Sequence, residues 1–168
     1  MVTEESFVEE GPVRRFGRRL GAMKPMSRLF ARVLHPLDKA VFRLTRGRRT
    51  ATSVLTGLPI VMLTTTGAKS GVKRTWPLVG FRDGEGRLVV IASNYGQANH
   101  PAWYHNLRAN PEATVRVDGV ETRVRARQAE GEERDRLWAR GLEIYPGWAS
   151  YEVRAAPRVI QIFVLEPA

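Results

Sequence analysis

Short apolar runs separated by tight turn signals are the feature that most constrains how this chain can fold. Asp118-Gly119 is a strongly favoured hairpin dipeptide, and the stretches on either side of it, ATVRV and VETRVRARQ, alternate apolar and charged residues. A second turn signal, DGEG at residues 83–86, precedes the almost continuous apolar run RLVVIAS. We therefore expect antiparallel strands joined by hairpins, with the RLVVIAS strand buried on both faces.

The order of these runs predicts a small antiparallel β-barrel. Six strand-like runs occur, beginning with PIVMLTTTG and ending with RVIQIFVLEP, and a short helix over about residues 101–109 separates the third from the fourth. A longer helix is expected over about residues 132–145. The fold class is α+β, mainly β, because regular alternation of strands with long helices is missing from the sequence.

The N-terminal third of the chain is basic and has a different pattern. Of the 168 residues, whose net charge is +10, the stretch 12–49 holds twelve Lys or Arg and only one acid, Asp38. Two amphipathic helical pieces are expected around Pro36, and their apolar stripe would either pack on the core or lie on an anionic membrane surface. Residues 1–55 therefore form a basic helical extension of a barrel domain at 56–168.

Several functional classes are excluded by what the sequence lacks. It has no cysteine, no Gly-x-Ser-x-Gly elbow, no Gly-x-Gly-x-x-Gly after a strand and no phosphate-binding Gly-Lys-Thr/Ser loop. His100 and His105 are five residues apart, which does not place them on one helix face, so no metal site is expected. No apolar run reaches the ~20 residues of a spanning helix, and the expected location is the cytoplasm.

Three groups of residues are candidates for binding. In TTTGAKSGVKRTWP, glycines at 67 and 71 bring main-chain N–H groups and basic side chains together at one turn, which suits an anion; a solvated hairpin turn is the alternative. Trp103 and Asn106 share a helix face and would form the edge of a flat heteroaromatic ring, or belong to the core. Three aromatic residues in YPGWASY, interrupted by Pro-Gly, would line an apolar pocket.

At these residues the sequence resembles the deazaflavin (F420)-dependent nitroreductase family of mycobacteria and other actinobacteria. The resemblance is carried by LTTTGAKSGVKRTWPL, VVIASNYGQANHPAWYHNLRANPEATVRV and YPGWASY, followed by a terminal VIQIFVLEP. It covers roughly residues 55–168 and implies a split β-barrel with flanking helices, so that residues 56–168 would be a deazaflavin-binding domain. It also implies a homodimer as the expected assembly.

The resemblance assigns roles to residues by position. It implies that the basic turn binds the phosphate and oligoglutamate tail of the cofactor and that the residues after it bind the deazaflavin ring. The implied cofactor-binding residues are Lys69, Ser70, Lys73, Arg74, Pro77, Ala92, Ser93, Asn94, Trp103 and Asn106. Tyr145 and Tyr151 are the implied catalytic residues, as proton donors or as residues that orient a water. Val79 and Trp148 complete the implied substrate pocket, at positions where well-known family members carry tyrosine.

The function implied is an F420H2-dependent oxidoreductase that passes a hydride to an electrophilic small molecule such as a quinone, an enone or a nitro compound. Two alternatives stay open at this point. One is an FMN-binding split-barrel oxidoreductase, because a basic turn serves either phosphate. The other is a non-catalytic module that docks residues 12–49 on an anionic membrane, and a peripheral position on the inner face of the plasma membrane is compatible with the enzyme as well. No nucleic-acid partner is expected.

Overall fold

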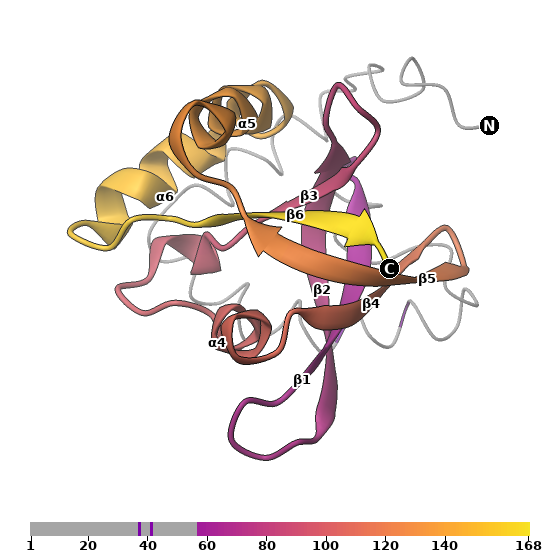
Figure 1. The fold of residues 1–168 in the computed structure, drawn as a ribbon. Coiled ribbons are helices and arrows are strands. Elements are labelled where there is room, and N and C mark those ends of the chain that lie inside the picture. The colour runs from indigo at the N-terminus through magenta and orange to yellow at the C-terminus, as the bar shows by residue number, and fades with distance from the viewer. Residues whose placement is uncertain (1–36, 38–40, 42–56) are drawn as a thin grey trace.

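The barrel predicted from the hairpin pattern is present in the structure. The structure is a computed structural model that describes Leu37, Val41 and residues 57–168 (Figure 1). Six strands form one closed barrel in the order β1-β2-β3-β6-β5-β4, and every neighbouring pair is antiparallel. The strands are β1 (Ile60–Thr66), β2 (Lys73–Arg82), β3 (Leu88–Ile91), β4 (Glu112–Val117), β5 (Val120–Gln128) and β6 (Ile162–Pro167).

Helices occupy two of the connections. A 3-10 turn, η2 (Asn94–Gly96), and helix α4 (Ala102–Ala109) link β3 to β4, while α5 (Gly131–Ile144) and α6 (Gly147–Ala155) link β5 to β6. In Figure 1, α5 and α6 lie together on one side of the barrel and α4 lies near β1. Of the described helices, none has the length and apolar character needed to cross a bilayer.

The β4–β5 hairpin shows how the local sequence fixes the fold. Asp118 and Gly119 have φ angles of 49° and 87°, the left-handed pair that a two-residue hairpin turn requires. Val115 then pairs with Thr122 and Arg116 with Glu121. Arg125 of β5 forms an exposed ion pair across the hairpin, with its Nη1 2.9 Å from Glu112 Oε1.

Strand β3 separates the two parts of the core, which confirms the prediction that it is buried on both faces. Leu88 and Val90 belong to a cluster that receives side chains from all six strands and from α4, and this cluster is the interior of the barrel. Val89 and Ile91 point the other way, into a cluster that α5 and α6 cover. The second cluster exists because two amphipathic helices need an apolar surface on which to pack.

The fresh helix start expected within YPGWASY is confirmed, because α6 begins at Gly147. The boundary of the last strand differs from the expectation. The last strand starts at Ile162, so Arg158 to Gln161 lie in a connecting segment that the apolar pattern had assigned to the strand. Leu37 and Val41 are helical, as expected, but the remainder of the predicted basic extension and its surface role lie outside the described residues.

Candidate functional site

The basic turn between β1 and β2 is closed by its own main chain. Gly67 N donates to Val72 O at 2.9 Å and Gly71 N donates to Gly67 O at 2.8 Å. Gly71 has a φ of +66°, which favours glycine, and a side chain on Gly67 would lie 2.5 Å from Ser70 Oγ. This geometry turns the chain tightly while the residues between the glycines remain exposed to solvent.

The cations of this turn have no acidic partners in the described part of the chain. Lys69, Lys73 and Arg74 are exposed, and no carboxylate of residues 57–168 lies within ion-pair distance of them. The Ser70 hydroxyl accepts a hydrogen bond from Val72 N at 3.3 Å and adds a polar group to the same surface. Two ammonium groups, a guanidinium and a hydroxyl at one turn suit phosphate or carboxylate groups.

Asn106 of α4 fastens this turn to the barrel. Its Oδ1 accepts a hydrogen bond from Ala68 N at 3.0 Å, and its Nδ2 donates to Thr65 Oγ1 at 2.9 Å. Thr65 is 1% exposed, and its hydroxyl also accepts a hydrogen bond from Trp76 Nε1 at 3.3 Å. Both ends of the Asn106 amide are thus hydrogen-bonded within the protein, and they position the main chain beside Lys69.

Trp103 lies one helical turn before Asn106 and faces the barrel interior. It is 3% exposed, and its ring meets Phe163 edge-on at 5.8 Å between centroids. Sequence reasoning left open whether this residue lines a ligand ring or belongs to the core. The structure places it in the core, where it holds α4 on the barrel end next to the basic turn.

The segment after β3 carries the next three candidate residues. Ala92 is completely buried, whereas Ser93 and Asn94 are partly exposed. Asn94 Nδ2 donates to Asn99 O at 2.8 Å and so bridges the ends of this loop. Asn94, Tyr95 and Gly96 have successive φ angles of 47°, 54° and 71°, an uncommon run of left-handed residues.

Strand β2 joins the basic turn to the other side of the barrel. Lys73 and Arg74 begin the strand, and Pro77 and Val79 follow on the face that also carries Phe81. From Arg74 to Val79 the strand extends about 17 Å at ~3.3 Å per residue. Val79 packs against the same apolar cluster as the aromatic residues of α5 and α6, so one strand connects the cations with that cluster.

Tyr145, Trp148 and Tyr151 are brought together, as the spacing predicts, and they are buried. Their exposed fractions are 6%, 2% and 4%, and the Tyr145 ring meets Trp148 at 5.7 Å and Tyr151 at 5.8 Å. The two phenol hydroxyls lie 3.1 Å apart in a hydrogen bond. Burial, together with the neighbouring Tyr145, raises the pKa of Tyr151 far above its ordinary value, so this hydroxyl stays protonated.

Two contacting residues were missed by sequence reasoning. Thr65 looks like an ordinary strand residue, although a buried threonine beside a glycine turn is a weak signal of a polar contact. Arg158 donates to the main chain of residues 92, 93 and 97. No local pattern reveals that contact, because its acceptors are more than sixty residues away in the sequence.

Comparison with known proteins gives a consistent result. The family model described as F420H(2)-dependent quinone reductase matches residues 37–167. The F420H(2)-dependent quinone reductase Rv1261c of Mycobacterium tuberculosis strain H37Rv is 38% identical over 104 residues, which make up 61% of this chain and 68% of that protein. The family match therefore includes the basic turn, the β3–α4 segment and helix α6.

Two solved structures have the same fold and appreciable sequence identity. The F420-H2 dependent reductase FDR-A has a TM-score of 0.59 and 41% identity, and the match covers 64% of this chain and 94% of that one. A domain-swapped dimer has a TM-score of 0.61 and 36% identity, covering 76% of this chain and 95% of that one. Neither match supports the FMN alternative. The chain therefore belongs to the F420H(2)-dependent quinone reductase family, and it is an oxidoreductase whose cofactor is coenzyme F420.

Proposed function

We propose that this protein transfers a hydride from F420H2 to a quinone and that β2 aligns the cofactor. The observation that carries the proposal is the pairing of an unpartnered basic turn at the start of β2 with an aromatic cluster farther along the same strand. Lys69, Ser70, Lys73 and Arg74 would hold the phosphate and the carboxylates of the cofactor tail, since these groups are anionic and accept several hydrogen bonds. The donor set therefore fits the cofactor of the family.

The ring would lie farther along the strand. We place it against Pro77 and the main chain of Ala92, Ser93 and Asn94, with Asn106 and Trp103 supporting the wall from behind. The burial and contacts of Trp103 and Asn106 support this placement. Both side chains pack or hydrogen-bond inside the protein, and they fix α4 and the basic turn next to the proposed ring site. Reduced F420, when bound, supplies the hydride, and the protein contributes position and exclusion of water.

The acceptor would meet the aromatic cluster of α6. Reduction of a quinone to a hydroquinone needs one hydride and one proton, and negative charge develops on the quinone oxygen that receives the proton last. A hydroxyl of Tyr145 or Tyr151 would donate a hydrogen bond to that oxygen, while water supplies the proton. Because its pKa is raised, Tyr151 keeps its proton over the ordinary pH range and suits a hydrogen-bond donor better than an acid. Val79 and Trp148 would bound the space for the quinone.

Replacement of the tyrosine hydroxyl tests this arrangement. A Tyr151→Phe variant should bind F420 like the wild type but reduce a soluble quinone about 10²-fold more slowly, the usual effect of removing one donor to a developing oxyanion. Tyr104→Phe is the matched control, because Tyr104 is similarly buried and, among the described residues, its hydroxyl accepts a bond from Arg108 alone, at 3.3 Å. Equal rates for the two variants would refute the role given to Tyr151.

The same assay tests the basic turn. Arg74→Ala and Lys69→Ala should each weaken F420 binding, more strongly at low salt than at high salt, because exposed ionic contacts are screened. Arg123→Ala is the control, an exposed arginine of β5 on another part of the barrel. If the control weakens binding as much as Arg74→Ala does, the tail is not held at this turn.

Assembly and surface binding are proposals of the same kind. We propose a homodimer, because a relative with 36% identity was solved as a domain-swapped dimer; light scattering of the purified chain tests it. Residues 12–49, whose composition suits an anionic membrane, can be tested by flotation with liposomes, comparing the full chain with one that lacks residues 1–50. Enone and nitro acceptors, expected from the initial resemblance, would be assayed beside the quinone.

A further inference from the structure

Arg158 donates hydrogen bonds from all three of its guanidinium nitrogens to the main chain of one loop. It lies between α6 and β6, and its Nε donates to Gln97 O at 3.0 Å. Its Nη1 donates to Ala92 O at 3.1 Å, and its Nη2 donates to Ser93 O and to Gln97 O, both at 2.9 Å. The three acceptors are neutral carbonyls at the two ends of a single loop, Ala92 to Gln97, which these bonds draw together.

The loop that Arg158 holds is in a costly conformation. Asn94 and Tyr95 have positive φ, which non-glycine residues rarely adopt, and Gly96 follows with a φ of +71°. Gly96 is also pressed against α6, where an added Cβ would lie 2.9 Å from both Cα and O of Tyr151. Such conformations persist only where the surroundings enforce them, and Arg158 supplies four of the enforcing hydrogen bonds.

Arg158 has no ionic role that would explain its presence. In the part of the chain that the structure describes, no carboxylate forms an ion pair with it, and burial alone lowers the pKa of its guanidinium. A half-buried cation without an anion is unfavourable unless its donors are satisfied. The planar fork of arginine satisfies them with carbonyls in fixed directions, which a flexible ammonium group cannot reproduce.

We propose that Arg158 is a positioning residue for F420, which sets the place of the Ala92–Gln97 main chain against the deazaflavin ring. The inference rests on the proposed function, which places the ring beside Ala92 and Ser93. Two of the three carbonyls that Arg158 binds belong to those residues. The guanidinium thus acts from the far side of the loop, and it fixes the wall without contacting the cofactor.

The test compares three variants of the full-length protein. Arg158→Lys keeps the charge but loses the fork, and Gly96→Ala pushes the loop away from α6 while Arg158 remains. Arg134→Lys is the matched control, since Arg134 is also partly buried and donates to a main-chain carbonyl, that of Ile160 at 3.4 Å, but forms no hydrogen bond to the loop in the described structure and pairs with Asp135 instead. The readouts are F420 affinity by fluorescence titration, amide hydrogen exchange of residues 92–99, and the KM values for F420H2 and a soluble quinone.

We expect Arg158→Lys and Gly96→Ala to raise the Kd for F420 at least ~10-fold, because a displacement of about 1 Å is enough for such losses. Exchange at residues 92–99 should accelerate, the KM for F420H2 should rise with the Kd, and the KM for the quinone should stay near the wild-type value. The control should stay within about twofold in all readouts.

Other results would refute either the role of Arg158 or the proposed function on which it rests, and the measurements distinguish these two cases. If folded Arg158→Lys and Gly96→Ala proteins bind F420 as tightly as a wild type that reduces the quinone, the positioning role is wrong and the proposed function stands. If Arg134→Lys weakens binding equally, the effect is one of general stability and the role of Arg158 is again wrong. A wild type that binds no F420 and reduces no quinone refutes the proposed function itself, and with it the inference.

Discussion

Replacing Asn106 by alanine should destabilise the protein and loosen the basic turn. The side chain is 7% exposed and makes two hydrogen bonds, one from Ala68 N and one to Thr65 Oγ1. Thr65 keeps the bond from Trp76 Nε1, but Ala68 N loses its only hydrogen bond in the described structure. Ala68 is exposed, so its freed N–H can bond to water, and the two lost hydrogen bonds of ~0.5–1.5 kcal/mol each should lower the free energy of unfolding by about 1–3 kcal/mol.

Urea unfolding followed by circular dichroism measures this change directly. For a chain of this length each kcal/mol shifts the thermal midpoint by ~2–4 °C, so thermal unfolding should show a decrease of about 2–12 °C. Asn110→Ala is the matched control: Asn110 ends the same helix, and within residues 57–168 its side chain accepts a single, exposed hydrogen bond, from Glu112 N at 3.0 Å. A surface change of this kind usually stays within ~0.5 kcal/mol.

The Asn106→Ala variant also tests whether the Asn106 amide acts by holding the basic turn or by binding the cofactor directly. If Asn106 acts by holding Ala68, the affinity for F420 should fall at temperatures where the variant is fully folded. Added salt should then reduce the affinity of the variant by a smaller factor than it reduces that of the wild type. An unfolding free energy equal to that of Asn110→Ala would refute the argument, because it would mean that the buried amide does not bridge α4 and the turn.

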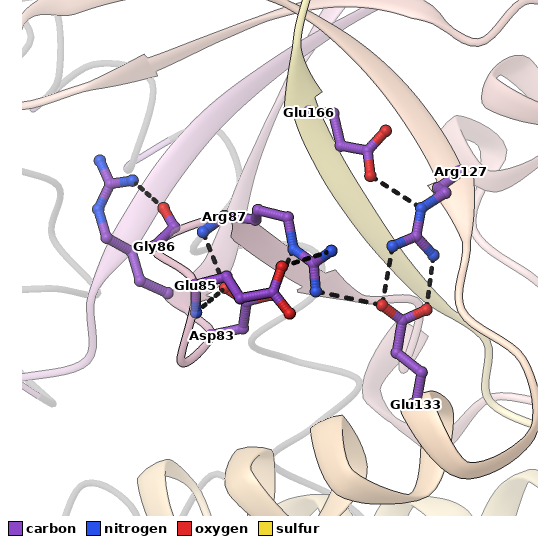
Figure 2. A network of polar contacts seen from close by, with 8 residues as sticks. Asp83, Glu85, Gly86, Arg87, Arg127, Glu133 and Glu166 are labelled. Carbon is purple, nitrogen blue, oxygen red and sulfur yellow. Dashed lines mark hydrogen bonds and ion pairs between the residues drawn. The ribbon is translucent and has the colours of Figure 1, made fainter.

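Two further predictions concern stability elsewhere in the barrel. In the network of Figure 2, a hydrogen bond from Arg127 lowers the pKa of Glu133. Ionised Glu133 therefore stabilises the folded state at pH values above its unfolded-state pKa of about 4.3. This stabilisation is lost as the pH falls through the lower pKa of the folded state. Urea midpoints at pH 7, 5, 4 and 3 should therefore fall less steeply for Glu133→Gln than for the wild type, with the exposed Glu143→Gln as the control; parallel slopes would contradict this. Gly147→Ala should cost about 1–3 kcal/mol, because the new Cβ would clash with the Tyr145 ring, whereas Gly84→Ala, with open space around it, should be nearly neutral in the same urea titration.

The strands and hairpins could be predicted from the sequence because their determinants are local. Alternation of apolar and charged residues defines β4 and β5, and Asp118-Gly119 supplies the left-handed turn between them. The double-sided burial of β3 follows equally from its continuous apolar run. What could not be predicted is how the arginines of β5 are used, because their partners depend on register: Arg127 meets Glu166 of β6 and Glu133 of α5 only once the barrel closes (Figure 2).

The candidate site also has one part that local sequence predicts and one part that depends on distant contacts. Its exposed cations were recognisable from the glycine-bounded turn, since both the turn and the charges lie within a few residues. The buried part was recognisable only as a set of aromatic residues, and their contacts with Phe81 and Tyr95 come from other elements. Arg158 gave no signal, because an arginine that donates to carbonyls requires no complementary residue type anywhere in the sequence.

In this arginine-rich protein, the basic turn differs from much of the barrel because its cations form no ion pairs in the described structure. Arg87, Arg125 and Arg127 each lie against at least one carboxylate, so their charges are balanced within the fold. Lys69, Lys73 and Arg74 are balanced by none in the described structure, although they lie within six residues of one another. Mutual repulsion at such a turn costs little while water surrounds it, and it is relieved when an anion binds. Other arginines, such as Arg123 and Arg158, also lack an ion pair among the described residues, but only the turn gathers three such cations within six residues, where the proposed function places the anionic tail of the cofactor.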